Sequence, residues 1–326
     1  MMSGLEISEI KLSELIIDNE KYRFDSEFFQ KIYIDTYTAI KKHSFKQLSA
    51  LIDVLTDFHA NGSYESIAQN FSLLDDPNYA YMVRSTDLEK SNYINDVKYV
   101  SEHSYNFLAK SKVLGGELLI NKIGSPGRTY LMPTLNRPVS LGMNLFMIRL
   151  KNNSLVNNIF VWLFLNTSLG KHVINRKVNG TVPLTIDKEA IKSLPIPIVS
   201  VKFQKYLKHI VNRAESILND SKALYSAAES RLLSALGMDN FTPSAEPVAV
   251  KSFSESFGTS GRLDAEYYQQ KYDSLFHKIG KHACKRLGDL VKIEKSIEPG
   301  SDFYSDDGIP FVRVSDITKF GIQQPD

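Results

Sequence analysis

Apolar positions along the first 200 or so residues follow short and changing periods, and one long regular stripe comes after them. Between Arg23 and Lys42 the apolar side chains have helical spacing, and Asp25 can cap the start of such a helix. The spacing is helical again from Val156 to Lys171. Short apolar runs, mostly flanked by Gly, Pro, Asn or Ser, predict strands at residues 79–83, 117–123 and 145–150. Helices and strands without regular βαβ alternation predict an α+β domain.

A single long helix is predicted after this domain. Residues 203–236 contain no Pro or Gly, and a helix of that length would extend about 50 Å. The prolines of Leu194–Ile198 predict an extended connector before it, and Gly237 ends it. Its stripe has the heptad spacing of a coiled coil and includes Leu207, Val211, Ala214, Leu218, Tyr225, Ala228 and Leu232. The stripe needs a partner, either another helix of this chain or one from a second copy, unless the helix packs wholly on its own domain.

The chain contains a long internal repeat. Residues 23–51 recur at residues 262–290, and residues 83–88 recur at residues 312–317 after a small shift in register. Identical residues include Arg23, Asp25, Glu27, Gln30 and Tyr33, which return as Arg262, Asp264, Glu266, Gln269 and Tyr272. A repeat this long indicates a duplicated domain rather than a solenoid. We expect a complete module at residues 1–201, a long helix at 202–237, a linker at 238–261 and the opening part of a second module at 262–326.

The composition is that of a folded protein with about two domains: 326 residues, of which 43% are hydrophobic. No run of about 18 apolar residues occurs, and Met1–Lys11 lacks the basic and apolar parts of a secretion signal. Cys284 is the one cysteine, which excludes an internal disulfide and fits a reducing compartment. We expect a cytoplasmic protein without a membrane segment.

Positive charge is concentrated in one part of the sequence. Residues 84–180 contain 13 of the 39 Lys and Arg residues but 5 of the 37 Asp and Glu residues. The net charge of +2 therefore hides a basic segment in an otherwise acidic chain. A clustered positive surface is typical of a nucleic-acid-binding protein, because each neutralised phosphate releases counterions. A solvated basic face without a partner is the alternative.

The residues with the clearest binding chemistry lie in loops of this basic segment. One turn after an expected strand contains Lys122, Gly124, Ser125, Gly127 and Arg128. Glycines let backbone N–H groups approach an anion, and an arginine can bind phosphate or the edge of guanine. The spacing differs from that of a P-loop, and a plain hairpin turn is the alternative.

Further polar candidates surround an Asn-Gly turn: Arg176, Lys177, Asn179, Gly180 and Thr181. Such groups bind base edges and phosphates, although Asn-Gly is also a common turn. Asn144 is a lesser candidate of the same kind. Arg84, which is repeated as Arg313, could contact DNA or pair with Asp87, for which we favour a structural role.

Catalytic motifs are absent from the sequence. No Gly-x-Ser-x-Gly, His-Glu-x-x-His or Asn-Pro-Pro-Phe sequence occurs, and the seven histidines lack metal-ligand spacing. His43 and His282 coincide in the repeat, but each follows a lysine at an expected helix end, where the helix dipole favours a cation. We therefore expect no catalytic residue and no metal site.

The order of the motifs resembles a known family. Arg-x-Asp-x-Glu with two aromatic residues comes first, and Val-Arg-x-Ser/Thr-Asp follows it. Gly-Glu-Leu-Leu-Ile with the Gly-x-x-Gly-Arg loop comes next, and Asn-Gly-Thr and Ser-Leu-Pro-Ile-Pro-Ile precede the long helix. This order resembles the specificity (S) subunit of type I restriction-modification systems over nearly the whole chain. The segment Val199–Gln204 keeps the family's glutamine but lacks a proline that usually precedes it.

The resemblance implies a target recognition domain, a long spacer helix and part of a second recognition domain. It implies a non-catalytic chain that binds double-stranded DNA and no cofactor. Its partners would be modification (methyltransferase) subunits, which use S-adenosylmethionine, and a restriction (motor and nuclease) subunit, which uses ATP and Mg. The implied recognition surface contains Arg84, Lys122, Gly124, Arg128 and residues 179–181, and the implied spacer is residues 203–236.

Several alternatives stay open at this point. The second module stops at Asp326, so a homodimer through the spacer helix is one expectation and an interrupted gene is another. A protein-interaction scaffold is an alternative function, and a hydrolase is disfavoured because no triad or metal set is present. The recognised bases do not follow from the sequence, because readout depends on loop geometry and DNA shape as well as on side-chain type.

Overall fold

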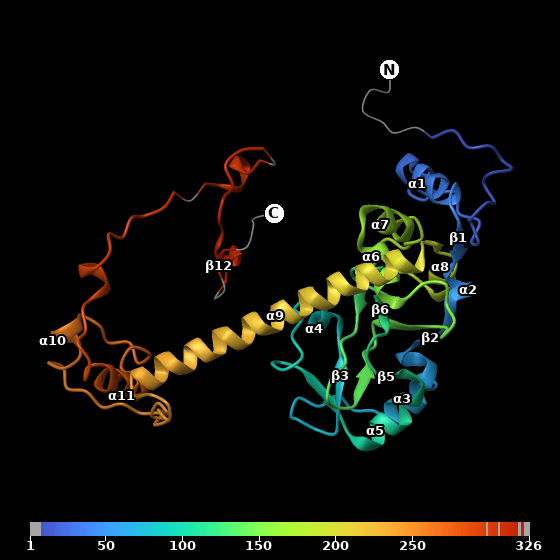
Figure 1. Cartoon of the computed structure of the whole chain (residues 1–326). Helices are drawn as coiled ribbons and strands as arrows, with labels where there is room; N and C mark the ends of the chain where they lie inside the picture. The colour runs from blue at the N-terminus through green and yellow to red at the C-terminus, as the bar shows by residue number, and fades with distance from the viewer. Residues whose placement is uncertain (1–7, 298, 306, 319–320, 323–326) are drawn as a thin grey trace. The chain divides into compact units, whose positions relative to one another are not determined.

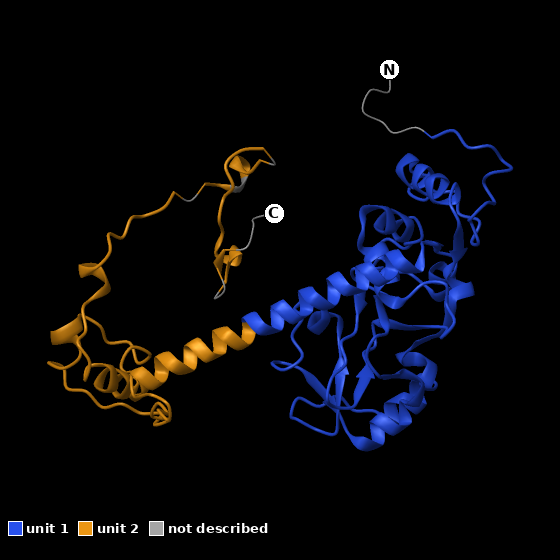
Figure 2. Ribbon diagram, viewed as in Figure 1, with its two compact units in different colours: residues 1–221 blue, residues 222–326 orange. Residues whose placement is uncertain are grey.

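The computed structural model describes residues 8–297, 299–305, 307–318 and 321–322, and Figure 1 shows the course of the chain. Its residues group into two compact units, 1–221 and 222–326, which Figure 2 colours separately. The boundary falls inside the long helix α9, Val201–Ala235. Most of the segment considered as a secretion signal, residues 1–7, and the end of the second expected module, residues 323–326, lie outside the described residues.

Unit 1 contains two four-stranded sheets. The first is antiparallel and has the order β2 (Ile52–Asp57), β9 (Leu145–Leu150), β6 (Leu118–Asn121) and β7 (Thr129–Leu131). The second has the order β4 (Lys98–Val100), β3 (Ala80–Val83), β8 (Val139–Leu141) and β5 (Lys112–Val113), with β3 and β8 parallel. The three expected strands are confirmed as β3, β6 and β9. All residues of β3 and β6 are buried, which explains their continuous apolar runs.

The larger core lies between the first sheet and the helices α1 (Lys31–Lys41), α6 (Asn158–Asn166), α7 (Ser168–Asn175) and α8 (Lys188–Lys192) (Figure 1). Ile120 and Phe146 of the sheet belong to the same buried cluster as Tyr37, Val161 and Ile191 of these helices. The other short elements are α2 (Leu48–Leu51), η1 (Phe58–Asn61), α3 (Tyr64–Asn70), α4 (Ser85–Glu89), α5 (Glu102–Phe107) and η2 (Ala109–Ser111), where η denotes a 3-10 helix. The α+β class expected from the sequence is confirmed.

A short strand pair joins an early and a late segment of the first module. β1 (Phe45–Gln47) pairs antiparallel with β10 (Pro195–Pro197). The Pro-Ile-Pro connector is therefore extended, as expected, and it forms an edge strand. Proline fits this place because an edge strand leaves some backbone positions without a ladder partner.

Two expected helices have different bounds from those predicted. The helix expected from Arg23 begins at Lys31, because the Asp25 carboxylate accepts the Phe28 N–H at 3.0 Å and forms a turn before the helix. The helix expected over 156–171 is two helices, α6 and α7, with a break at Thr167. The Thr167 hydroxyl accepts the Gly170 N–H at 3.1 Å and so caps α7, which is local chemistry that an apolar pattern does not contain.

The long helix α9 is confirmed, with 35 residues. Buried Gln204 anchors its first turn, because its Oε1 accepts the Asn157 N–H at 2.9 Å and its Nε2 donates to the Leu155 and Val199 carbonyls. Leu207 packs against the larger core. Farther along, several large apolar residues of the helix are exposed: Leu218, Leu224, Leu232 and Leu233. None of the helices within the described ranges combines the length and apolar character of a membrane span.

Unit 2 repeats the local geometry that opens unit 1. Its elements are α10 (Phe257–Ser260), α11 (Gln270–Ile279), η3 (Leu287–Asp289), η4 (Ser301–Phe303), η5 (Val314–Asp316), β11 (Ile317–Thr318) and β12 (Gly321–Ile322). Arg262 donates two bonds of 2.6 Å to Asp264, as Arg23 donates bonds of 2.7 and 2.6 Å to Asp25. The edge-to-face ring pair Phe28–Phe29 returns as Tyr267–Tyr268, with centroids 5.0 Å apart in both. These matching contacts support the duplication read from the sequence.

Equivalent side chains of the two copies of the repeat are buried to different extents. Phe28 is 2% exposed, whereas its counterpart Tyr267 is 47% exposed. Leu48 is fully buried, whereas Leu287 is 67% exposed. In the first copy, later residues cover these side chains, because Arg176 at the end of α7 lies over the Phe28 ring and α2, which contains Leu48, packs on α8. Among the described residues, unit 2 leaves the same face open.

Candidate nucleic-acid interface

Three loops from separate parts of unit 1 meet at the edge of the first sheet where β6 ends and β9 begins. The Lys122 N–H donates to the Asn144 carbonyl at 2.8 Å, and the Ile186 N–H donates to the Lys122 carbonyl at 3.0 Å. Ile123 and Thr185 form an antiparallel bridge. We call this surface the loop edge and define it as residues 122–128, 143–144 and 179–184. The structure thus brings together most of the candidates that the sequence scattered over some 60 positions.

Two glycines shape the first of these loops. Gly124 has φ +86° and Gly127 has φ +84°, in the left-handed region that favours glycine. A Cβ on Gly127 would lie 2.0 Å from Cγ2 of Ile174, so this glycine lets the loop pack against α7. A Cβ on Gly124 would meet open space. Gly127 therefore fixes the loop, and Gly124 leaves its backbone accessible.

Lys122 is held by an internal ion pair. Its Nζ donates to Asp57 at 2.7 Å, and Lys188 donates to the other oxygen of the same carboxylate at 2.8 Å. Burial alone would raise the pKa of Asp57, but the bonds from the two lysines hold that pKa below its ordinary value. Lys122 therefore ties β2 to the loop edge, and in this structure its charge is not free to meet DNA.

Arg128 is the most accessible cation of the loop edge. Its side chain is 61% exposed, although one nitrogen donates to Glu89 of α4 at 3.0 Å. Tyr130 also donates to Glu89, at 3.3 Å. Exposed ion pairs contribute little stability, so Arg128 can leave Glu89 for a phosphate or a base at small cost.

Arg176 and Lys177 are buried, which corrects the expectation that they contact DNA. The Arg176 guanidinium lies 4.4 Å from the ring centroids of Phe28 and Tyr37. Lys177 donates to Glu20 at 2.6 Å, and burial lowers the pKa of its amine although Glu20 opposes that effect. Both cations hold the N-terminal segment against the end of α7. We remove them from the candidate surface.

Arg84 also has a structural partner. Its guanidinium pairs with Asp87, and Arg313 pairs with Asp316 in unit 2 in the same capping arrangement. The structural role favoured for Asp87 agrees with this geometry. Of the two roles left open for Arg84, the structure shows the ion pair.

The Asn179–Thr181 turn stands out from the surface. The backbones of Asn179 and Thr185 bond to each other in both directions, at 2.9 and 2.8 Å. The Asn179 Oδ1 accepts from the Thr185 hydroxyl at 2.9 Å, which closes the base of the turn. Gly180 and Thr181 are exposed at its tip, and Val182 beside them is 93% exposed. The tip of this turn is therefore open to solvent.

Acidic residues from outside the basic segment offset part of its charge. The lysines with such partners are Lys98, Lys122 and Lys177, which pair with Asp75, Asp57 and Glu20. The arginines paired within the segment are Arg84, Arg128 and Arg149, whose partners are Asp87, Glu89 and Glu117. The surface is therefore less basic than the sequence segment indicates.

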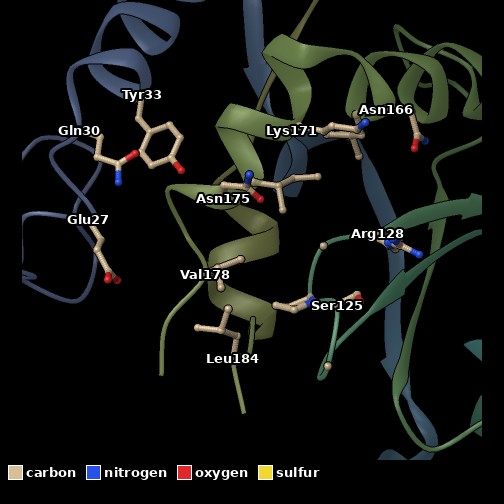
Figure 3. Close-up of a pocket in the computed structure, with 15 residues that line it drawn as sticks. Glu27, Gln30, Tyr33, Ser125, Arg128, Asn166, Lys171, Asn175, Val178 and Leu184 are labelled. Carbon is tan, nitrogen blue, oxygen red and sulfur yellow. The ribbon is translucent and has the colours of Figure 1, made fainter. Parts of the chain in front are cut away.

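A pocket of about 580 Å³ opens beside the loop edge (Figure 3). Its walls come from residues 124–128, from the α7 region and from the start of α1. Tyr33 points from α1 toward α7, and Asn175 lies opposite it (Figure 3). Its other polar lining residues include Glu27, Gln30, Asn166 and Lys171. The sequence analysis did not predict that these residues form a site. The identity of Glu27, Gln30 and Tyr33 in both copies of the repeat could have indicated it.

We searched the described residues for groups of side chains that could bind a metal ion. No group of three or more His, Cys, Asp or Glu side chains there could hold a metal ion. The polar groups of the loop edge are amides, hydroxyls, backbone N–H groups and an arginine, which bind by hydrogen bonds and charge.

Partial backbone similarity relates the chain to solved structures. The type I restriction-modification S subunit from M. genitalium matches with 15% identity and a TM-score of 0.36, over 58% of this chain and 43% of that chain. The HsdS subunit from Thermoanaerobacter tengcongensis matches with 13% identity and a TM-score of 0.34, over 60% and 46%. A structure from work on the assembly of the type I R-M system matches with 15% identity and a TM-score of 0.36, over 63% and 51%.

The matches span about half the length of those chains. No family model and no curated protein matches the sequence. Two of the three structures are S subunits, the family that the order of the sequence motifs resembles.

Proposed function

We propose that the chain is the sequence-specific DNA-binding subunit of a type I restriction-modification complex and has no catalytic role of its own. The observation that supports this most is the convergence of the loop edge. Gly124, Arg128, Asn144 and the 179–181 turn come from distant parts of the sequence and lie together on a rigid sheet. Loops held by a rigid scaffold suit base and phosphate contacts, because the scaffold fixes their register.

The partners in this proposal are other subunits as well as DNA. The exposed apolar residues of α9 suit a protein partner, which we take to be the modification subunits or the α9 helix of a second copy. The modification subunits would use S-adenosylmethionine, and a restriction subunit would use ATP and Mg. The chain would act in the cytoplasm without binding these cofactors itself.

Mapping adenine methylation in cells tests the role in specificity. With partner subunits present, we expect one DNA motif to be methylated when the gene is intact and unmethylated when it is deleted. An exchange of residues 179–184 for a loop of equal length should change or abolish that motif. If complexes still form and the methylated motif never depends on this chain, it is an interaction scaffold rather than a recognition subunit.

A further inference from the structure

We propose that the pocket beside the loop edge receives one unstacked base of the bound DNA and prefers a base with an exocyclic amino group (adenine, cytosine or guanine) over thymine. The inference rests on the proposed DNA-binding function and adds a ligand to that site. At about 580 Å³, the pocket lies within the range of roughly 300–1,000 Å³ typical of small-ligand sites. Its lining residues come from separate segments of unit 1, and the space between them is large enough for one flat group.

The pocket combines an apolar lining with unused polar groups. Leu165, Ile174 and Val178 offer apolar surface to the face of a ring. The side chains of Glu27 and Gln30 form no hydrogen bond or ion pair with any residue in the described ranges. Polar groups with no internal partner, placed around an apolar lining, are what a site needs to orient a planar polar ligand.

The Glu27 carboxylate determines which bases the pocket can bind by hydrogen bonds. An ionised glutamate only accepts hydrogen bonds, so Glu27 suits the exocyclic amino groups of adenine, cytosine and guanine. The single N3–H of thymine lies between two carbonyl oxygens, which repel a carboxylate. It also repels phosphate from the interior. Lys171 and Arg128, which line the same pocket, are the groups that suit the flanking phosphates.

The second copy shows how these side chains can act together. Glu266, Gln269 and Tyr272 are the counterparts of Glu27, Gln30 and Tyr33. In unit 2 the Glu266 carboxylate accepts from Gln269, and from the Tyr272 hydroxyl at 3.2 Å. Donors at these positions can therefore converge on this carboxylate. In unit 1 the Glu27 carboxylate is left for a donor from outside.

The test is a titration of the whole protein with deoxyadenosine, deoxycytidine and thymidine, followed by calorimetry or NMR. Duplex DNA binding is measured in parallel. We expect the first two nucleosides to bind about tenfold more tightly than thymidine. Glu27→Gln should remove most of that preference, because an amide offers a donor that thymine can accept. Glu65→Gln, at an exposed position of α3, is the matched control and should keep the preference.

The outcomes separate the inference from the proposed function. Equal affinity for the three nucleosides, or an unchanged preference in Glu27→Gln, overturns the inference even when duplex DNA binds. If the nucleosides bind but duplex DNA does not, the proposed function fails, and the pocket cannot be a site for a base of bound DNA.

Discussion

The Arg84 guanidinium and the Asp87 carboxylate form a two-bonded ion pair at the end of β3, with an Nη2–Oδ1 distance of 2.7 Å and an Nε–Oδ2 distance of 3.2 Å. Asp87 also accepts from the Arg84 N–H at 3.0 Å and from the Tyr81 hydroxyl at 2.8 Å. Burial, and next the bond to Asp87, raise the pKa of that hydroxyl. The buried carboxylate thus joins the second sheet to α4.

Removing this carboxylate should destabilise unit 1. We expect Asp87→Ala to lower the free energy of unfolding by about 3 kcal/mol, because it leaves a buried hydroxyl without an acceptor and a cation without its partner. Urea denaturation monitored by circular dichroism measures the change. Asp76→Asn, at an exposed position, is the control and should change little. Equal stability of the two variants would contradict the structural role.

Acid should weaken the ion pairs of Asp57 with Lys122 and Lys188. The pKa of Asp57 is lower in the folded chain than in the unfolded chain, so this residue stabilises the fold above the unfolded value and loses that contribution as the pH falls below about 4. The urea midpoint of the wild type should therefore fall more between pH 6 and pH 3 than that of Asp57→Asn. Asp53→Asn, an exposed change on the same strand, should behave like the wild type. An Asp57→Asn variant as acid-sensitive as the wild type would refute this assignment.

The two loop glycines should differ in their response to alanine. Both need positive φ, so each substitution carries a backbone cost of about 1 kcal/mol. Gly127→Ala adds a collision with buried Ile174 and should cost at least about 2 kcal/mol, whereas Gly124→Ala should cost the backbone term alone. Thermal or urea unfolding of the pair isolates the contact with α7. Equal losses would show that the loop does not depend on that contact.

Arg128→Ala tests whether this side chain reads a base. If it binds guanine, discrimination at one base pair should weaken by about 1–3 kcal/mol, as measured with a set of single-substitution duplexes. If it binds phosphate, affinity should fall uniformly across the set. Lys110→Ala, at an exposed lysine of η2, serves as a control for loss of charge. Unchanged binding to every duplex would remove Arg128 from the interface.

Local patterns in the sequence predicted three strands of the two four-stranded sheets, β3, β6 and β9, and the long helix α9, but not β2, β4, β5, β7 or β8. The strands β3, β6 and β9 are short apolar runs because they are buried, and α9 lacks every residue that breaks a helix. The break at Thr167 was missed, because a cap depends on one hydroxyl and not on the apolar pattern.

The candidate site was predicted less well, because its electrostatics come from contacts between distant residues. Lys122 and Asp57 are 65 positions apart, and Lys177 and Glu20 are 157 positions apart. Counting the charges of residues 84–180 alone reveals neither ion pair, because both acidic partners lie outside that segment. The glycines and amides of the loop edge were found from the sequence, because turn chemistry is local.

The most direct test of the central claim is the salt dependence of DNA binding. Fluorescence anisotropy with labelled duplex DNA would measure the affinity of the purified chain, alone and with its modification subunits, over a series of salt concentrations. We predict that the logarithm of the binding constant falls linearly with the logarithm of salt concentration, with a slope of about −0.9 for each phosphate contacted. An affinity that does not change with salt, or no binding under any of these conditions, would contradict a DNA-recognition role.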